Sequence, residues 1–285
     1  MDKNSFLKGK YENNFDQIVL GSLLGDGMLE IPRERNGNTG NCVLKIKHSG
    51  AQLKYLEWIS ESLCDYGLCG KNPIRRTISY HKRTGKEYES YLFESRRSVK
   101  LSMWEKDFYK HSGKRRHKIV TRRVLNRLEP LGLAIWWMDD GHLAYNIRTN
   151  GKGGSFQLVF STEGFSVEEN FKIQQYFKLM WGINWRVQKC GKDGSGVHLA
   201  CGITEGSKFF DIIRGYVHSS LIYKITPEIQ KEKAIERWKI RNETKRQPSL
   251  MDEDIVGTPQ ITQTSCDVIK VESATEMIAP QRINC

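Results

Sequence analysis

The chain has 285 residues, 38% of them hydrophobic and 10% aromatic, and a formal net charge of +12 at pH 7. This length and composition predict a globular protein of one large or two ordinary domains. They exclude a membrane-spanning protein, because no apolar run reaches the ~18 residues that a spanning helix needs. The opening MDKNSFLKGKYENN lacks the apolar core of a signal peptide, so we expect a non-secreted, intracellular protein. A bacterial or phage-infected cytoplasm and an organelle both stay open as its compartment.

The positive charge is concentrated in the first 250 residues. Residues 251–285 hold six acidic and two basic side chains, a net of −4, which leaves +16 on residues 1–250. A surplus of this size on a folded body favours a polyanionic partner, most often nucleic acid. A generally basic surface without a ligand is the alternative.

The cysteines indicate a reducing compartment. There are seven of them, an odd number, and they form no paired CxxC sets. We therefore predict reduced thiols, and the spacing disfavours a structural zinc site.

After an N-terminal segment (residues 1–15), the first half predicts helices that alternate with pairs of strands. A helix over about 16–25 ends at Asp26-Gly27. Strand-like GMLEIPRE, the turn cluster RNGNTGN and the alternating CVLKIKH follow this helix. Residues 51–68 carry apolar side chains at helical spacing. A long basic hairpin from IRRTISY to SYLFESR comes next, and a helix around KLSMWEKDFYK closes the half.

The second half repeats this order. Its apolar helix ends at Asp140-Gly141, and HLAYNIR, the glycine-rich turn TNGKGGS and the alternating FQLVFST follow. A helix over 168–182 has two glutamates in its first turn, as the helix dipole favours. NWRVQKC and VHLACGI flank another turn, and a helix through GSKFFDIIRGYV ends the pattern. The order helix, two strands, helix, two strands, helix therefore occurs twice.

Two apolar segments that end in Asp-Gly mark the starts of the two halves. They are VLGSLLGDG (19–27) and LAIWWMDDG (133–141), and their acids Asp26 and Asp140 lie 114 positions apart. Such a repeat indicates an internal duplication. Carboxylates rarely end a buried segment unless they are paired or bind a cation. For the second segment alone, a buried helix that Gly141 stops and whose acids reach solvent is an equal alternative, although a helix C-terminus disfavours acids.

Cationic side chains recur on the predicted strands and their turns. A strand directs alternate side chains to opposite faces, so one face can pack on helices while the other presents cations. We predict that these faces bind DNA, since paired strands can enter the major groove; an ordinary solvated face is the alternative. The predicted DNA-binding residues are Arg33, Arg35, Lys45, Lys47, Arg75, Arg76, His81, Lys82, Arg83, Lys86, Arg148, Lys152, Arg186, Lys189 and Lys192.

The paired motifs, their spacing and the element order resemble the LAGLIDADG homing endonucleases, specifically the single-chain, intron-encoded type with two motif copies. WWMDDG and the downstream YKI (223–225) are close to the subgroup found in mobile introns. The resemblance implies an α+β fold of two pseudo-symmetric αββαββα half-domains, residues 16–128 and 129–228. Their antiparallel sheets would form a DNA-binding saddle.

The resemblance also implies a metal site shared between the halves. The two motif helices would pack side by side, with the small residues Gly21, Gly25 and Ala134 at their contact. Asp26 and Asp140 would meet over the DNA and hold Mg²⁺ or Mn²⁺, since hard cations of this kind take oxygen ligands. Two carboxylates that close to each other should not both stay ionised without a cation.

Four further residues take their expected roles from the resemblance. Gly25 and Asp139 are neighbours that would complete or tune the metal site. Lys118 and Lys224 match positions where the family keeps a basic residue near the scissile phosphates, and they would offset developing negative charge. His117 is a rival to Lys118 because the alignment around RRHKIV is gappy.

The function that the resemblance implies is a divalent-metal-dependent, site-specific endonuclease. It would hydrolyse both strands of double-stranded DNA at a long target and promote the mobility of its own intron or intein. We expect a monomer with no membrane partner. One alternative is an intron RNA maturase that binds its own intron RNA. Another is a non-cleaving DNA-binding regulator, which the retention of both acids disfavours.

Beyond the part that resembles the family, the chain continues. Residues 229–246 predict a basic helical extension. Residues 247–285 are polar and lack hydrophobic periodicity, so we expect a disordered tail.

Overall fold

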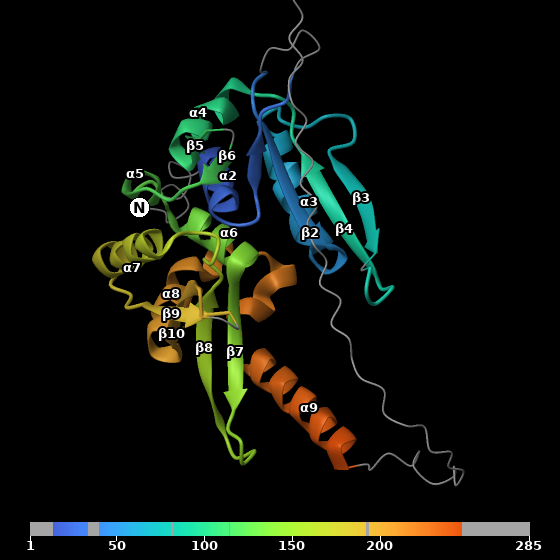
Figure 1. The fold of residues 1–285 in the computed structure, drawn as a ribbon, viewed down its shortest axis with the longest axis vertical. Helices are drawn as coiled ribbons and strands as arrows, with labels where there is room; N and C mark the ends of the chain where they lie inside the picture. Colours follow the sequence, from blue (N-terminus) through green and yellow to red (C-terminus); the bar gives the residue numbers. More distant parts are fainter. Residues whose placement is uncertain (1–13, 34–39, 81, 114, 192–193, 247–285) are drawn as a thin grey trace, which may run out of the picture. The chain divides into compact units, whose positions relative to one another are not determined.

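The computed structural model describes residues 14–33, 40–80, 82–113, 115–191 and 194–246 (Figure 1). Most of the N-terminal segment, the tail 247–285 and the predicted DNA-binding residues Arg35, His81 and Lys192 lie outside the described residues. The described residues up to Asn242 belong to one compact unit. Among the described helices, none is both long enough and apolar enough to cross a membrane.

The first half contains a four-stranded antiparallel sheet in the order β1-β2-β4-β3. Leu44, Ile46 and His48 line the buried face of β2, whereas Lys45 and Lys47 alternate with them on the other face. The elements are α2 (Asn14–Leu24), β1 (Met28–Glu30), β2 (Val43–Ser49), α3 (Leu53–Cys64), β3 (Ile74–Tyr80), β4 (Glu87–Glu94) and α4 (Val99–Phe108).

The second half repeats this topology, with a sheet in the order β7-β8-β10-β9. The predicted α+β class and the twofold αββαββα order are therefore confirmed. The elements are α6 (Pro130–Asp140), β7 (Gly141–Ile147), β8 (Gly154–Phe160), α7 (Val167–Trp181), β9 (Arg186–Cys190), β10 (Gly196–Gly202) and α8 (Ile203–Ile213), followed by short 3₁₀ turns up to Ile225 and by α9 (Pro227–Arg246).

The link between the halves contains elements that the sequence pattern did not predict. A two-stranded ribbon, β5 (Tyr109–Ser112) with β6 (Arg115–Lys118), precedes the short helix α5 (Arg122–Leu125). The ribbon is tied to β1, because the Leu29 N–H donates to the Tyr109 hydroxyl at 2.9 Å and Arg116 donates to the Leu29 carbonyl at 2.7 Å. This attachment brings the end of β6, with Lys118, to the end of α2.

Helices α2 and α6 pack against each other at the centre of the core. Both are predominantly apolar, and nearly all of their residues are buried, as is typical of a helix in the middle of a core. A Cβ added to Gly21 would lie 2.5 Å from the Gly132 carbonyl oxygen, and one added to Gly132 would lie 2.5 Å from Gln17 Oε1. Ala134 is fully buried. Glycine and alanine therefore let the two backbones approach closely here.

Gly141 does not stop α6 in the way that a left-handed C-terminal glycine would. Its φ of −83° and ψ of 143° are extended, so its backbone conformation is open to any residue. A Cβ on Gly141 would instead lie 2.1 Å from the Trp137 ring. The glycine is required because the buried indole occupies the space beside it, which corrects the helix-stop interpretation.

The cysteines depart from the prediction that all of them are reduced thiols. Cys64, the last residue of α3, forms a disulfide with Cys69. The four residues between them turn back at the helix end, which brings two cysteines without a CxxC spacing together. Cys42, Cys190 and Cys201 keep their thiols.

Candidate active site

Three acids gather where α2 and α6 end. Asp140 is the last residue of α6, and Asp26 follows α2 by two residues. The backbone N–H of Asp26 donates to Asp139 Oδ2 at 3.2 Å. The Asp26 side chain is 42% exposed, whereas the Asp139 side chain is 0% exposed. The pair of helices thus brings the acids of both motifs to one place, with Asp26 open to solvent.

Burial and nearby negative charge raise the pKa of Asp139 and of Asp140. Burial, followed by the charge of Asp26, raises the pKa of Asp140 to about 7. Burial, followed by the charges of Asp26 and Asp140, raises the pKa of Asp139 well above its usual range. A cation bound between these acids would favour their ionised forms, because opposite charge lowers the pKa of a carboxyl group.

Each predicted lysine reaches the motif of its own half. Lys118 Nζ donates to the carbonyl oxygens of Gly25 at 3.0 Å and Gly27 at 2.8 Å. Lys224 Nζ donates to the carbonyl oxygens of Met138 at 2.5 Å and Asp139 at 3.3 Å. Burial lowers the pKa of both lysines, while the nearby acids act in the opposite direction.

His117, the rival to Lys118, lies on the alternate face of β6. His117 is exposed, whereas Lys118 is half-buried. The alternation of the strand therefore places Lys118, and not its neighbour, at the acids.

Two residues that the sequence did not single out complete this cluster. His48 Nδ1 lies 3.4 Å from Asp26 Oδ2, and His48 Nε2 lies 3.6 Å from Asp139 Oδ1. The Tyr55 hydroxyl donates to Asp139 Oδ1 at 2.9 Å. Burial lowers the pKa of His48, against the opposite effect of Asp26. The sequence pattern could have indicated His48, because the alternation of β2 places it on the same face as the buried Leu44 and Ile46.

The donor atoms at this site suit a hard divalent cation. Carboxylate oxygens are the ligands that Mg²⁺ and Mn²⁺ prefer, and Asp26 offers an accessible one. Donor atoms of Asp26, His48 and Asp139 all lie within 4.8 Å of one another. The Gly25 carbonyl is already an acceptor for Lys118. Asp139 is occupied by Tyr55 and the Asp26 N–H, so it supports the site from beneath.

A second cluster of potential metal ligands lies on the second sheet. Donor atoms of Glu163, Cys190 and His198 fall within 4.8 Å of one another. His198 Nδ1 lies 3.1 Å from Glu163 Oε1. No predicted site residue belongs to this cluster.

The predicted cations of the first sheet are divided between its faces. Lys45, Lys47 and Arg75 share one face, but Arg76 is in register with Tyr91 and points to the face that carries Phe93. Acidic side chains pair several of these cations: Lys45 with Glu30 at 2.6 Å, Arg75 with Glu94 at 2.5 Å, and Arg76 with Glu89. One face of this sheet therefore presents Lys45, Lys47 and Arg75, as alternation predicted, whereas Arg76 lies on the other face.

The remaining predicted cations lie mainly outside the strands. Arg186 and Lys189 point to opposite faces of β9, since Lys189 is in register with the buried Val197. The others that the structure describes are exposed, either in hairpin turns or, for Arg33, beyond β1; they are Arg33, Lys82, Arg83, Lys86, Arg148 and Lys152.

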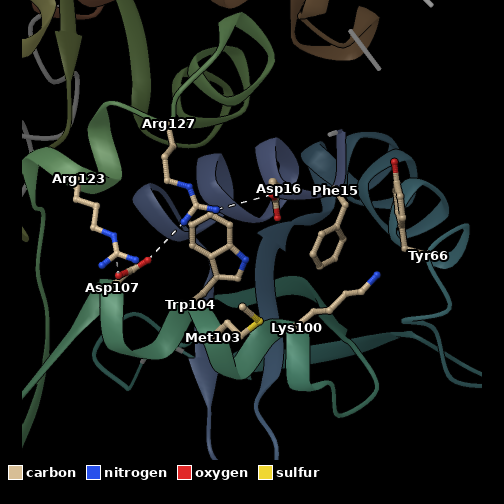
Figure 2. A pocket seen from close by; sticks show the side chains of 9 residues that line it. All are labelled: Phe15, Asp16, Tyr66, Lys100, Met103, Trp104, Asp107, Arg123 and Arg127. Atoms are coloured by element: carbon tan, nitrogen blue, oxygen red, sulfur yellow. Dashed lines mark hydrogen bonds and ion pairs between the residues drawn. The ribbon is translucent and has the colours of Figure 1, made fainter. Parts of the chain in front are cut away.

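A separate pocket of about 370 Å³ lies between α2 and α4 (Figure 2). The Arg127 guanidinium lies 3.8 Å from the centroid of the Trp104 ring and forms ion pairs with Asp16 and Asp107. Figure 2 shows that these side chains bridge neighbouring elements. The pocket contains no predicted site residue, and its ion pairs join α2, α4 and the segment after α5.

Comparison with known proteins identifies the family. The model of the LAGLIDADG DNA endonuclease family matches residues 16–209. The chain therefore belongs to this family.

Relatives carry several different names. Protein RecA of Mycolicibacterium flavescens is 28% identical over 225 residues, which cover 77% of this chain and 48% of that protein. DNA endonuclease I-ChuI of Chlamydomonas applanata is 26% identical over 73% of this chain and 93% of that protein. Cytochrome b mRNA maturase bI2 of Saccharomyces cerevisiae is 26% identical over 76% of this chain and 48% of that protein. The chain thus spans about half the length of several curated relatives.

A solved structure supports the fold. The homing endonuclease I-WcaI bound to its DNA recognition sequence aligns with 79% of this chain and 95% of its own, with a TM-score of 0.57 and 18% sequence identity.

Proposed function

We propose that the chain is a site-specific endonuclease that hydrolyses both strands of double-stranded DNA at a long target and promotes the mobility of its intron or intein. The observation that carries the proposal is the pairing of two helix ends, each with an acid and with a half-buried lysine from its own half. The charge of Asp26 raises the pKa of both Asp139 and Asp140, and a cation bound there would offset this repulsion between carboxylates.

Asp26 and Asp140 would hold Mg²⁺ or Mn²⁺. Such a metal activates water and stabilises the leaving oxygen of a phosphodiester. Lys118 and Lys224 would lie beside the two scissile phosphates and offset the negative charge that develops there. Asp139 would fix the position of Asp26 through its hydrogen bond to the Asp26 N–H.

His48 would add a further positioning contact. It lies between Asp26 and Asp139, and the neutral imidazole that burial favours can accept or donate a hydrogen bond without adding charge. Its role would be to hold the exposed Asp26 carboxylate in one orientation.

The exposed cations in the hairpin turns, with Lys47 on the sheet, would contact DNA phosphates. Lys45, Arg75 and Arg76 form ion pairs with glutamates. They would therefore contribute less to the affinity for DNA until the DNA displaces these glutamates. Duplex DNA would bind to a monomer.

An intron RNA maturase is the second candidate. It is favoured by the similarity to a protein named cytochrome b mRNA maturase. A basic protein surface can bind DNA or RNA, so it does not separate the two functions. Asp26 and Asp140 would separate them, because DNA cleavage requires these acids and RNA folding does not.

The test uses a plasmid that carries the DNA flanking the gene's insertion, joined without the insertion. With Mg²⁺ or Mn²⁺ the protein should convert supercoiled plasmid to linear product at one site, and EDTA should stop the reaction. A plasmid with the insertion still in place is the matched control and should stay uncut. Splicing of the intron RNA by the protein, with no cutting of either plasmid, would favour the maturase and contradict the endonuclease.

A further inference from the structure

Helix α9 is docked beside the edge strand of the second sheet (Figure 1). Gln230 Nε2 donates to the Tyr223 carbonyl at 2.8 Å near the start of the helix. Further along, Trp238 lies against the β7–β8 turn, because a Cβ on Gly151 would be 2.7 Å from the indole ring. One contact therefore ties the start of α9 to the 3₁₀ segment that precedes it, and the other places Trp238 against the turn that follows β7.

A groove runs between α9 and β7. Its first part, about 480 Å³, begins at Lys224 and His142 and passes Asn146 and Arg237. A second hollow of about 330 Å³ continues past Trp238 to Arg241. The residues that line the two parts include no Asp or Glu. The groove is thus lined by polar, aromatic, aliphatic and cationic groups, and it starts at the candidate active site.

The guanidinium groups in the groove differ from those on the first sheet. Arg75 and Arg76 are each paired with a glutamate. Within the described part of the chain, neither Arg237 nor Arg241 has a carboxylate within ion-pair distance. The two lie four residues apart and therefore project from the same side of the helix, about 5–6 Å from each other.

We propose that this groove binds the phosphate backbone of duplex DNA that flanks the cleaved bonds on the side of the second half. The proposal rests on the proposed function, because it places Lys224 beside a scissile phosphate. Arginine presents donors in a fork that matches phosphate oxygens, and the groove runs along β7, an edge strand of the second sheet.

The groove would make DNA binding asymmetric. After Lys224 the chain continues into α9, whereas after Lys118 it continues through α5 into α6, the core helix of the second half. The duplex on the side of the second half would therefore gain contacts that the other flank lacks.

The experiment compares two double variants of the full chain. Arg237→Ala with Arg241→Ala removes the groove cations, and Lys231→Ala with Lys239→Ala removes the same charge from α9 residues that do not line the groove. Affinity is measured on duplex DNA at several salt concentrations. The arginine variant should bind at least tenfold more weakly and show a salt slope smaller by about 1–2, near the ~0.9 expected per phosphate. The lysine variant should lose less than threefold.

Duplexes shortened on one flank locate the contact. Shortening the flank beside the second half should bring the wild-type affinity down to that of the arginine variant, and shortening the other flank should keep their difference. Thermal unfolding of both variants checks that they are folded.

Equal losses in the two variants would overturn the groove, and so would a loss of affinity for intron RNA with none for duplex DNA. Cleavage of the target by the wild-type chain decides the endonuclease proposal separately. A chain that binds duplex through the groove but never cuts would contradict the endonuclease and retain the groove.

Discussion

Asp139 shows how one side chain can differ in role between two copies of a motif. In the first motif the matching residue is Gly25, and a Cβ there would lie 2.5 Å from the Cβ of Asp139. The larger side chain of one helix thus fills the space left by the glycine of the other. The sequence grouped both residues with the metal site, yet the contacts of Asp139 with Tyr55 and the Asp26 N–H make it a supporting residue.

The pKa of Asp140 predicts how stability depends on pH. The carboxyl group has a pKa of about 7 in the folded protein against a usual value of 3.8. Between these values the folded state binds more protons than the unfolded state, so this group makes the free energy of unfolding fall as pH rises. Asp140→Asn should remove the effect. Urea titrations with EDTA measure the free energy of unfolding of both proteins. The value for the variant should exceed that for the wild type by near zero at acidic pH and by at most about 4 kcal/mol above neutral pH. An offset that does not change with pH would contradict this.

The two lysines should act on different strands. Each donates to carbonyl groups of its own motif, so each would serve one scissile phosphate. Loss of one such electrostatic partner typically slows a reaction by ~10²–10³. Lys224→Met should therefore slow the cleavage of one strand and Lys118→Met that of the other, with nicked plasmid accumulating before linear product. Strand-labelled substrate measures both rates, and equal slowing of the two strands would show that the lysines lack this role.

At the scale of elements, the contact between α2 and α6 decides whether the acids meet. Gly21→Ala should destabilise the protein by about 1–3 kcal/mol, because the added Cβ would lie 2.5 Å from a backbone carbonyl oxygen and overpacking costs this much. Helix propensity alone would give the opposite sign, a gain of up to about 1 kcal/mol. Gly215→Ala, where nothing lies within 4 Å of the added atom, is the control. Denaturant unfolding that shows Gly21→Ala to be as stable as this control would contradict the close contact.

The elements also show where sequence patterns suffice. The apolar helices, the alternating strands and their twofold repeat follow from hydrophobic periodicity, and the structure has them in the predicted order. The β5–β6 ribbon was missed because HSGKRRHK is too polar to show alternation. It is held by the hydrogen bond that the Leu29 N–H donates to the Tyr109 hydroxyl and by the one that Arg116 donates to the Leu29 carbonyl. His48 and Tyr55 were missed because their importance comes from a contact with the other half of the chain. The Cys64–Cys69 disulfide follows from the turn at the end of α3, which spacing alone did not indicate.

At the scale of the whole molecule, charge predicts strong salt dependence. Residues 1–250 carry +16, and several neutralised phosphates should make affinity for duplex DNA fall by on the order of tenfold or more for a fourfold rise in salt.

A chain that ends at Pro248 lacks the acids of residues 251–285 and should bind and cut at least as well as the full chain. Binding titrations from low to moderate salt test both expectations. A flat salt dependence, or weaker binding by the shortened chain, would contradict them.

The central claim is that Asp26 and Asp140 form one metal-dependent centre for both strands. The most direct measurement follows supercoiled plasmid with the target sequence in Mg²⁺, using Asp26→Asn and Asp140→Asn, with Asp211→Asn on the surface of α8 as a control. Because the acids would share the metal, each active-site variant should yield neither nicked nor linear product while it still binds target DNA, and the control should cut normally. Linear product at the wild-type rate from either active-site variant would contradict the account.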